Sequence, residues 1–182
     1  QRHSSQLHDM ALLSLHTGMR AGEIFALRAG DVDFRNELIH VADPKNKRPR
    51  KAYMTAAVKD MLRSRINKDM EKQDLVFPSE TGEKIVFLSK TFSRTVDEIE
   101  LNKGVKDARQ KATFHTLRHT FASWLALQGE TIQTISELLG HSSLQMTMRY
   151  SHLSPDHKKA AIMHFERSLV KIENQEVQND KK

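Results

Sequence analysis

Two short segments of this chain pair a guanidinium with a side chain that could help it hold a phosphate. In residues 17–23, Arg20 follows a glycine and begins a predicted helix, and Glu23 lies one turn later on the same face. Such an arginine can present a planar fork of N–H donors to a phosphate while the glutamate orients it. An ordinary surface Arg–Glu pair explains this segment equally simply.

The second segment is residues 114–120, where His115 and Arg118 stand three residues apart on the first turn of a predicted helix. The N-terminus of a helix offers unpaired N–H groups to an anion, and an imidazole and a guanidinium add to that site. A buried or capping histidine would explain His115 alone. It explains the cluster of His115, Arg118 and His119 less well.

A predicted hairpin tip, residues 44–51, gathers five basic side chains: Lys45, Lys47, Arg48, Arg50 and Lys51. A two-stranded ribbon of this charge can reach a DNA groove and contact its phosphates. The alternative is a solvated charged loop. Both interpretations stay open at this point.

Residues 138–143 read Leu-Leu-Gly-His-Ser-Ser, and Tyr150 follows His141 by nine residues. The imidazole and the phenol could take part in the same chemistry. Residues 131–150 also resemble a helix-turn-helix with Gly140 at its turn, which would bind DNA without reacting with it. Tyr150 could equally be an aromatic residue that packs at a helix end.

Composition narrows the partners and the chemistry. The chain has 29 Lys and Arg against 23 Asp and Glu, a formal charge of +6 that suits DNA, RNA or an acidic membrane. It has no cysteine, which excludes disulfides, thiolate zinc sites and cysteine nucleophiles. Its histidines form no His-Glu-x-x-His frame, and no acidic cluster adjoins His115 or His141, so we expect neither a metal nor a cofactor. Without a signal peptide or an apolar run of membrane length, we expect a soluble intracellular protein.

The elements that must position these residues are mostly helices. Periodicity predicts helices over residues 5–16 and through Ile24 and Leu27, then strands at 32–34, 38–42 and 50–54 around a tip at 43–49. Thr55 is expected to cap the next helix, residues 74–78 to be extended, and a further helix to carry Phe92, Val96 and Ile99. Mostly helix with a small antiparallel sheet is an α+β pattern.

From residue 114 the chain is predicted to be helical almost to its end. The expected apolar positions are Leu117, Phe121, Trp124 and Leu125, then Ile132, Ile135 and Leu139 before a stop at Gly140. Ser142 or Ser143 could cap a short helix that leads to Tyr150. A final helix should begin near Pro155 with Ile162, Phe165 and Leu169 inward. We expect one domain over residues 1–170 and a disordered polar tail over 171–182.

Taken together and in this order, the motifs resemble those of the tyrosine recombinases, the phage-integrase-like site-specific recombinases. The match covers about residues 10–165: Thr-Gly-Met-Arg, a basic hairpin, His-x-x-Arg-His, Leu-Gly-His-Ser and a tyrosine. The resemblance implies that Arg20 and Arg118 clamp the scissile phosphate, with Glu23 supporting Arg20. It makes Lys45 the catalytic lysine, His115 and His141 the active-site imidazoles and Tyr150 the nucleophile. It also implies a mixed fold with a three-stranded antiparallel sheet at one edge.

Two positions depart from the family pattern. Asn46 stands where a glycine often follows the lysine, which leaves open whether Lys45 or Lys47 faces the phosphate. Tyr53 stands where proline is frequent, and it should lie along a strand. Lys47, Arg48, Arg50 and Lys51 are expected to contact DNA.

The resemblance implies an enzyme that cleaves and rejoins double-stranded DNA through a 3′-phosphotyrosyl intermediate, without metal, cofactor or ATP. His115 would act as the base, Lys45 as the acid, and His141 as a hydrogen-bond donor to the phosphate. We expect a monomer when free, a tetramer on paired DNA sites, and a cytoplasmic, nucleoid-associated location without a membrane. The family's N-terminal DNA-binding domain is expected to be absent from this chain. A non-catalytic helix-turn-helix module and a type IB topoisomerase-like DNA relaxer remain the alternatives.

Overall fold

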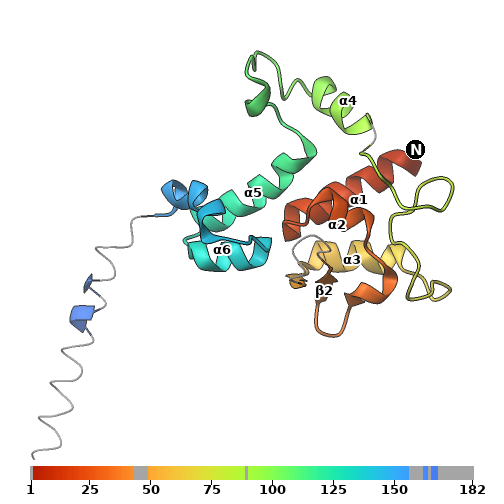
Figure 1. The fold of residues 1–182 in the computed structure, drawn as a ribbon, viewed down its shortest axis with the longest axis horizontal. Helices are drawn as coiled ribbons and strands as arrows, with labels where there is room; N and C mark the ends of the chain where they lie inside the picture. Colours follow the sequence, from red (N-terminus) through yellow and green to blue (C-terminus); the bar gives the residue numbers. More distant parts are fainter. Residues whose placement is uncertain (1, 43–48, 89, 156–161, 164, 168–182) are drawn as a thin grey trace, which may run out of the picture.

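The computed structural model describes residues 2–42, 49–88, 90–155, 162–163 and 165–167. Figure 1 shows two groups of elements, one built on α1, α3 and the small sheet, the other on α5 and α6. The helices are α1 (Arg2–Thr17), α2 (Ala21–Phe25), α3 (Ala56–Arg65), α4 (Thr91–Glu98), α5 (Phe114–Leu127) and α6 (Ile132–Leu139), with short 3₁₀ turns η1 (Ala29–Asp31), η2 (Ala108–Gln110), η3 (Leu144–Met146) and η4 (Met148–Leu153). The α+β prediction is confirmed.

The sheet has three antiparallel strands in the order β1 (Val32–Asp33), β2 (Leu38–Val41) and β3 (Arg50–Tyr53). Ile39 pairs with Ala52, and both are buried, whereas the next pair, His40 and Lys51, is exposed. Alternate residues of a strand point to opposite faces, so one face of the sheet joins the core and the other meets solvent. The predicted strands are therefore confirmed, each shorter by one residue.

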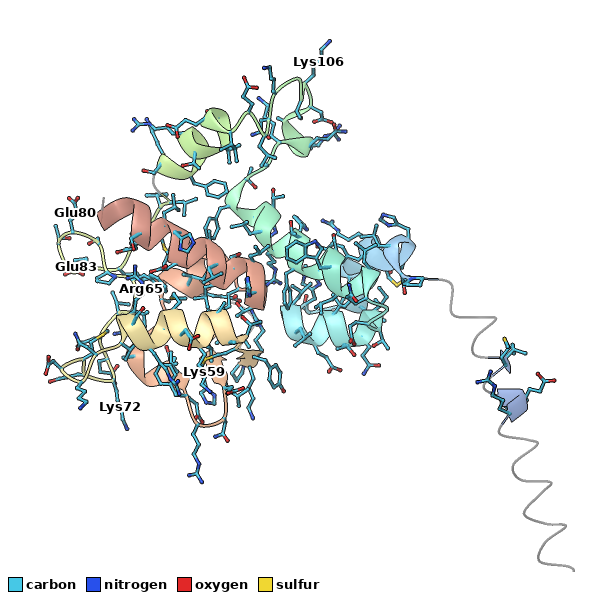
Figure 2. The ribbon with its side chains drawn as sticks, turned by 180° about the vertical axis from the view of Figure 1, so that it is seen from behind. Lys59, Arg65, Lys72, Glu80, Glu83 and Lys106 are labelled. Atoms are coloured by element: carbon cyan, nitrogen blue, oxygen red, sulfur yellow. The ribbon has the colours of Figure 1, made fainter. Side chains whose placement is uncertain are left out.

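The first core lies between α1, α2, α3 and the sheet, and its fully buried side chains include Leu13, Met19, Ile24, Ile39, Leu62 and Phe77. Thr55 caps α3 as predicted, because its hydroxyl oxygen accepts the N–H of Val58. Arg65, at the other end of α3, reaches α1 and donates from Nε to Asp9 at 2.7 Å (Figure 2). The Arg65–Asp9 ion pair joins α3 to α1.

The second core is smaller and is made by α5, α6 and η4. It consists of Ala122, Ala126, Ile135, Leu139 and Tyr150. Phe114, at the start of α5, belongs to the first core instead. Helix α5 therefore spans both cores, beginning beside α1 and ending against α6 (Figure 1).

A long excursion through α4 and η2 joins the first core to α5, and Lys106 marks its outer end in Figure 2. Val96 is buried there, and Phe92 packs edge-on against Phe114 with ring centroids 5.4 Å apart. Ile99 was predicted on the same helix, but α4 ends at Glu98 and the side chain of Ile99 is exposed. Its assignment to the apolar face was wrong.

Three other expectations need correction. Helix α2 ends at Phe25, so Leu27 lies beyond the helix, although its side chain is buried. Trp124, expected in the apolar stripe of α5, is 53% exposed, because small alanines at 122 and 126 face α6 in its place. Ile162 and Phe165, expected to point inward, are 67% and 62% exposed in the single chain, and Leu169 lies outside the described residues.

Within the described residues, none of the helices combines the length and the apolar character needed to cross a bilayer.

Candidate active site

Arg118 of α5 holds the ends of two other helices together. Its Nη1 donates to the carbonyl of Gly18 at 2.5 Å and its Nη2 to the carbonyl of Leu139 at 2.6 Å. The side chain lies almost wholly inside the protein, with 2% of the residue exposed. These bonds use two of the five guanidinium N–H groups, so donors remain for an anion.

Gly18 lets α5 approach this turn closely. Its φ is +66°, and an added Cβ would lie 2.7 Å from Cδ1 of Phe121 and 2.9 Å from Cδ2 of Leu139. A side chain there would be strained by the left-handed backbone and would push α5 and α6 away. The glycine of the Thr-Gly-Met-Arg motif therefore sets the distance between Arg20 and Arg118.

Glu23 lies between two arginines. Its Oε1 accepts from Nη1 of Arg20 at 3.0 Å, and its Oε2 accepts from the Arg20 backbone N–H at 2.7 Å and from Nη2 of Arg50 at 2.8 Å. The side chains of Glu23 and Arg50 are 8% exposed, whereas that of Arg20 is 31% exposed. Arg20 is thus the member of this trio best placed to meet an external phosphate.

The structure does not place Arg50 as a DNA-facing side chain. Besides its ion pair with Glu23, its Nη1 donates to the carbonyl of Leu138 at 2.9 Å. Arg50 pairs with Val41 at the base of the hairpin, so these bonds anchor the hairpin beside the end of α6. Lys51 is exposed on β3, and Tyr53 is exposed at the end of the same strand, as predicted. Lys45, Lys47 and Arg48 lie outside the described residues.

Gly140 ends α6 in the left-handed conformation, with φ +63° and ψ +45°, as predicted. An added Cβ would lie only 2.4 Å from Cδ of Arg50, so this glycine also makes room for the arginine. The turn directs His141 toward Thr147, whose hydroxyl oxygen lies 2.7 Å from Nδ1 of the imidazole. Two 3₁₀ turns follow instead of a second helix of the helix-turn-helix kind.

Tyr150 lies in η4 and is 6% exposed. Its Oη is 2.5 Å from Nδ1 of His119, and the ring of His119 meets that of His115 edge-on at 4.7 Å between centroids. The sequence placed His119 in a cluster with His115 and Arg118 but gave it no role in the chemistry. The signal was present, because residues 115 and 119 stand at i and i+4 and so share a helix face with the predicted catalytic groups.

Positive charge dominates this region. Burial, together with the charges of Arg20 and Arg50, lowers the pKa of Arg118 to about 9, although Glu23 and Tyr150 oppose the shift. Burial and the neighbouring arginines also lower the pKa of His141 to about 4. At neutral pH Arg118 remains charged while His141 is a neutral imidazole.

The other two histidines and the tyrosine are also shifted toward their neutral forms. Burial lowers the pKa of His115, and the charges of Arg118, Arg20 and Arg149 add to the effect. Burial raises the pKa of Tyr150 against the opposing charges of Arg149 and Arg118. The positive charge of the arginines, which helps keep the imidazoles neutral, favours binding of an anion.

No three His, Asp or Glu side chains converge as metal ligands would in the part of the chain that the structure describes. The acidic group nearest the arginines, Glu23, is already paired with both Arg20 and Arg50. The arginines that surround Glu23 and Arg118 leave this region with an excess of positive charge that suits an anion.

Comparison with known proteins agrees with this geometry. The model of the Phage integrase family matches residues 1–157. A tyrosine recombinase XerC of Chlamydia trachomatis serovar L2 is 32% identical over 158 residues, which is 83% of this chain and 48% of that protein. A tyrosine recombinase XerA of Saccharolobus solfataricus is 32% identical over 144 residues, 79% of this chain and 45% of that protein. The chain thus spans about half the length of these relatives.

Solved structures with the same fold include a XerA recombinase, with a TM-score of 0.62 and 27% identity over 90% of this chain and 58% of that one. The catalytic domain of the bacteriophage HP1 integrase has a TM-score of 0.60 and 27% identity, covering 86% of this chain and 80% of that one. The Tn1549 transposon integrase, in complex with a circular intermediate DNA, has a TM-score of 0.67 and 25% identity over 88% of this chain and 58% of that one.

Proposed function

This chain belongs to the phage integrase family, and on that premise we propose that it is the catalytic domain of a site-specific DNA recombinase or integrase. Tyr150 attacks a backbone phosphate of double-stranded DNA and forms a 3′-phosphotyrosyl bond, which releases a 5′-hydroxyl. A 5′-hydroxyl from a partner strand then reverses the step, so the energy of the bond is conserved and no ATP is needed.

One observation supports this function above the others: the two bonds of Arg118, which join the Thr-Gly-Met-Arg turn to the Leu-Gly-His turn. They join the turns that carry Arg20 and His141 to Arg118, and Tyr150 contacts His119, the residue that follows Arg118 on α5, at 2.5 Å. A non-catalytic DNA-binding module has no need for a buried arginine and a buried tyrosine in such an arrangement.

Arg20 and Arg118 neutralise the charge that gathers on the non-bridging oxygens of the pentavalent transition state. His141 adds a hydrogen bond to the same oxygens. His141 Nδ1 lies 2.7 Å from the Thr147 hydroxyl oxygen; in the tautomer in which that hydroxyl donates to Nδ1, the hydrogen on Nε2 is free to be donated to the phosphate. Lys45 protonates the leaving 5′-oxygen, with Lys47 as the other candidate, because an alkoxide is far more basic than a phenolate.

DNA is the partner that this charge suits, and Lys47, Arg48 and Lys51 extend the contact along the hairpin. Arg50 instead fixes the base of the hairpin through Glu23 and Leu138. We also propose that four such domains assemble on paired sites, with the exposed Phe165 docking on a neighbouring subunit. Burial of one phenylalanine contributes roughly 1.5–3 kcal/mol, too little to hold free monomers together at low concentration.

The test is incubation with nicked DNA substrates that lose the 5′-hydroxyl after cleavage and so trap the covalent adduct. Mass spectrometry of the adduct should identify Tyr150, and Tyr150→Phe should abolish it with nearly unchanged DNA affinity. An adduct at Tyr53, or one that persists in Tyr150→Phe, would refute the assignment. Rejoining between two separate DNA sites, rather than relaxation of a single supercoiled circle, distinguishes a recombinase from a topoisomerase-like enzyme.

A further inference from the structure

We propose that His119 is a catalytic residue that accepts the proton of the Tyr150 hydroxyl as its oxygen attacks phosphorus. The resemblance of the motifs to the family implies that His115 is the base. The proposal rests on Tyr150 being the nucleophile. It assigns the proton transfer to the imidazole that touches the reacting oxygen.

The first support is the contact itself. Nδ1 of His119 and Oη of Tyr150 are 2.5 Å apart, at the short end of the hydrogen-bonding range. Both groups are held in place: His119 follows Arg118, whose two carbonyl bonds fix α5, and the Tyr150 N–H bonds to the Thr147 carbonyl at 3.0 Å. A general base must lie within hydrogen-bonding reach of the proton that it takes, and His119 does.

The protonation states suit a phenol that donates to the imidazole. A phenol with an ordinary pKa near 10 is about a thousandth ionised at pH 7, and burial raises the pKa of Tyr150 further. Burial lowers the pKa of His119, and the groups facing it, His115, Arg149 and Arg118, lower it more. In the proposed step the hydroxyl donates and a neutral Nδ1 accepts, with the imidazole hydrogen on Nε2.

The neighbouring groups are not placed to accept the phenolic proton. His115 packs edge-on against the His119 ring, and within the described residues no hydrogen bond joins it to the phenol. Arg118 and Arg149 are donors only. Their charges lower the energy of a developing tyrosinate and also disfavour a lasting imidazolium at His119, so the transferred proton is held only briefly.

The atoms of the step balance. The bond between Oη of Tyr150 and phosphorus forms, the bond between phosphorus and the 5′-oxygen breaks, and the phenolic proton moves to Nδ1 of His119. The 5′-oxygen leaves as a hydroxyl with a proton from the lysine acid. When a 5′-hydroxyl attacks the phosphotyrosine, the lysine recovers its proton and His119 returns its own to the departing Oη.

Single-turnover cleavage of a nicked substrate tests the proposal with two variants. His119→Ala removes the acceptor and should slow cleavage by on the order of 10²–10⁴-fold. His119→Asn places an amide near the position of Nδ1, so it can keep the hydrogen bond but cannot take a proton. Its rate should stay low, and the fall in wild-type rate on acidification, which the lowered pKa of His119 shifts below the ordinary imidazole range, should vanish.

A second substrate separates the base from the acid. A 5′-bridging phosphorothiolate leaves as a thiolate and needs no proton, so it should restore a variant of the lysine acid but leave both His119 variants slow. Full activity of His119→Asn on either substrate would reduce His119 to a positioning residue and overturn the proposal. Faster cleavage by His119→Ala would also overturn it, because the contact would then restrain the tyrosine.

Three controls distinguish this failure from others. The adduct of every variant is mapped: if the wild-type adduct is not on Tyr150, the proposed function itself fails. DNA affinity and the free energy of unfolding should change little in His119→Asn. A variant of His115, which contacts the His119 ring, should keep the acid limb of the pH profile if His119 is the base, and loss of that limb would reassign the role to His115.

Discussion

Replacement of Gly140 by alanine tests whether the end of α6 and the base of the hairpin are built around each other. The new Cβ would lie 2.4 Å from Cδ and 2.9 Å from Nε of Arg50, too close for any real contact. Arg50 would have to leave Glu23 and the carbonyl of Leu138, which it now holds at 2.8 and 2.9 Å. The loss in free energy of unfolding therefore has two parts, one from the strained backbone and one from the broken ion pair.

The two parts can be estimated separately. A non-glycine residue in the left-handed conformation costs about 1–2 kcal/mol. Loss of a hydrogen bond to a charged group costs about 1.5–3 kcal/mol, and disruption of a buried ion pair about 3–5 kcal/mol. Since Glu23 keeps Arg20 as a partner, we expect the ion-pair part to lie between about 2 and 4 kcal/mol.

Gly82 supplies the matched control. It also has a positive φ, +82°, but nothing lies within 4 Å of an added Cβ. Gly82→Ala should therefore show only the backbone cost, together with the same change in the unfolded chain. Urea unfolding, followed by circular dichroism and by the single tryptophan, gives the free energy of unfolding for each variant.

Gly140→Ala should lose more free energy of unfolding than Gly82→Ala does. This difference should largely disappear when Arg50 is already alanine, because the clash has then been removed. Cleavage should fall along with stability in Gly140→Ala, since Arg50 anchors the lysine-bearing hairpin. Equal losses at the two glycines, or an excess that persists without Arg50, would refute the reasoning.

Other variants test the charges and the assembly. Arg20→Ala and Arg118→Lys should each slow cleavage by on the order of 10²-fold while DNA affinity falls much less; equal losses would demote them to ordinary phosphate contacts. Because the pKa of His141 is lowered to about 4 from 6.5, its contribution to stability is present above about pH 6.5 and is lost as the pH falls toward 4. His141→Gln should lose less stability than the wild type over that interval, and parallel curves would show that other groups cause the loss. Phe165→Ala should leave the unfolding free energy of the monomer unchanged and impair rejoining between two sites more than cleavage of one; an equal fall in both would contradict docking on a neighbour.

The family and most elements follow from the sequence because their signals are local. A glycine after an apolar stripe predicts the left-handed end of α6, and a threonine before a helix predicts the Thr55 cap, since each depends on backbone geometry within a few residues. The turn-forming residues between them likewise predict β2 and β3 as the two arms of a hairpin. The order of the motifs predicts the family, which the comparisons confirm.

Only the tertiary structure decides which side chains meet. Arg50 and Glu23 are 27 residues apart, and His119 and Tyr150 are 31 apart, so neither contact leaves a periodic signal in the chain. The same is true of Trp124, which is exposed because α6 packs on the alanines beside it. Residue types and spacing specify which groups are available for chemistry, whereas the packing of α5 against α1 and α6 determines their distances and their protonation states.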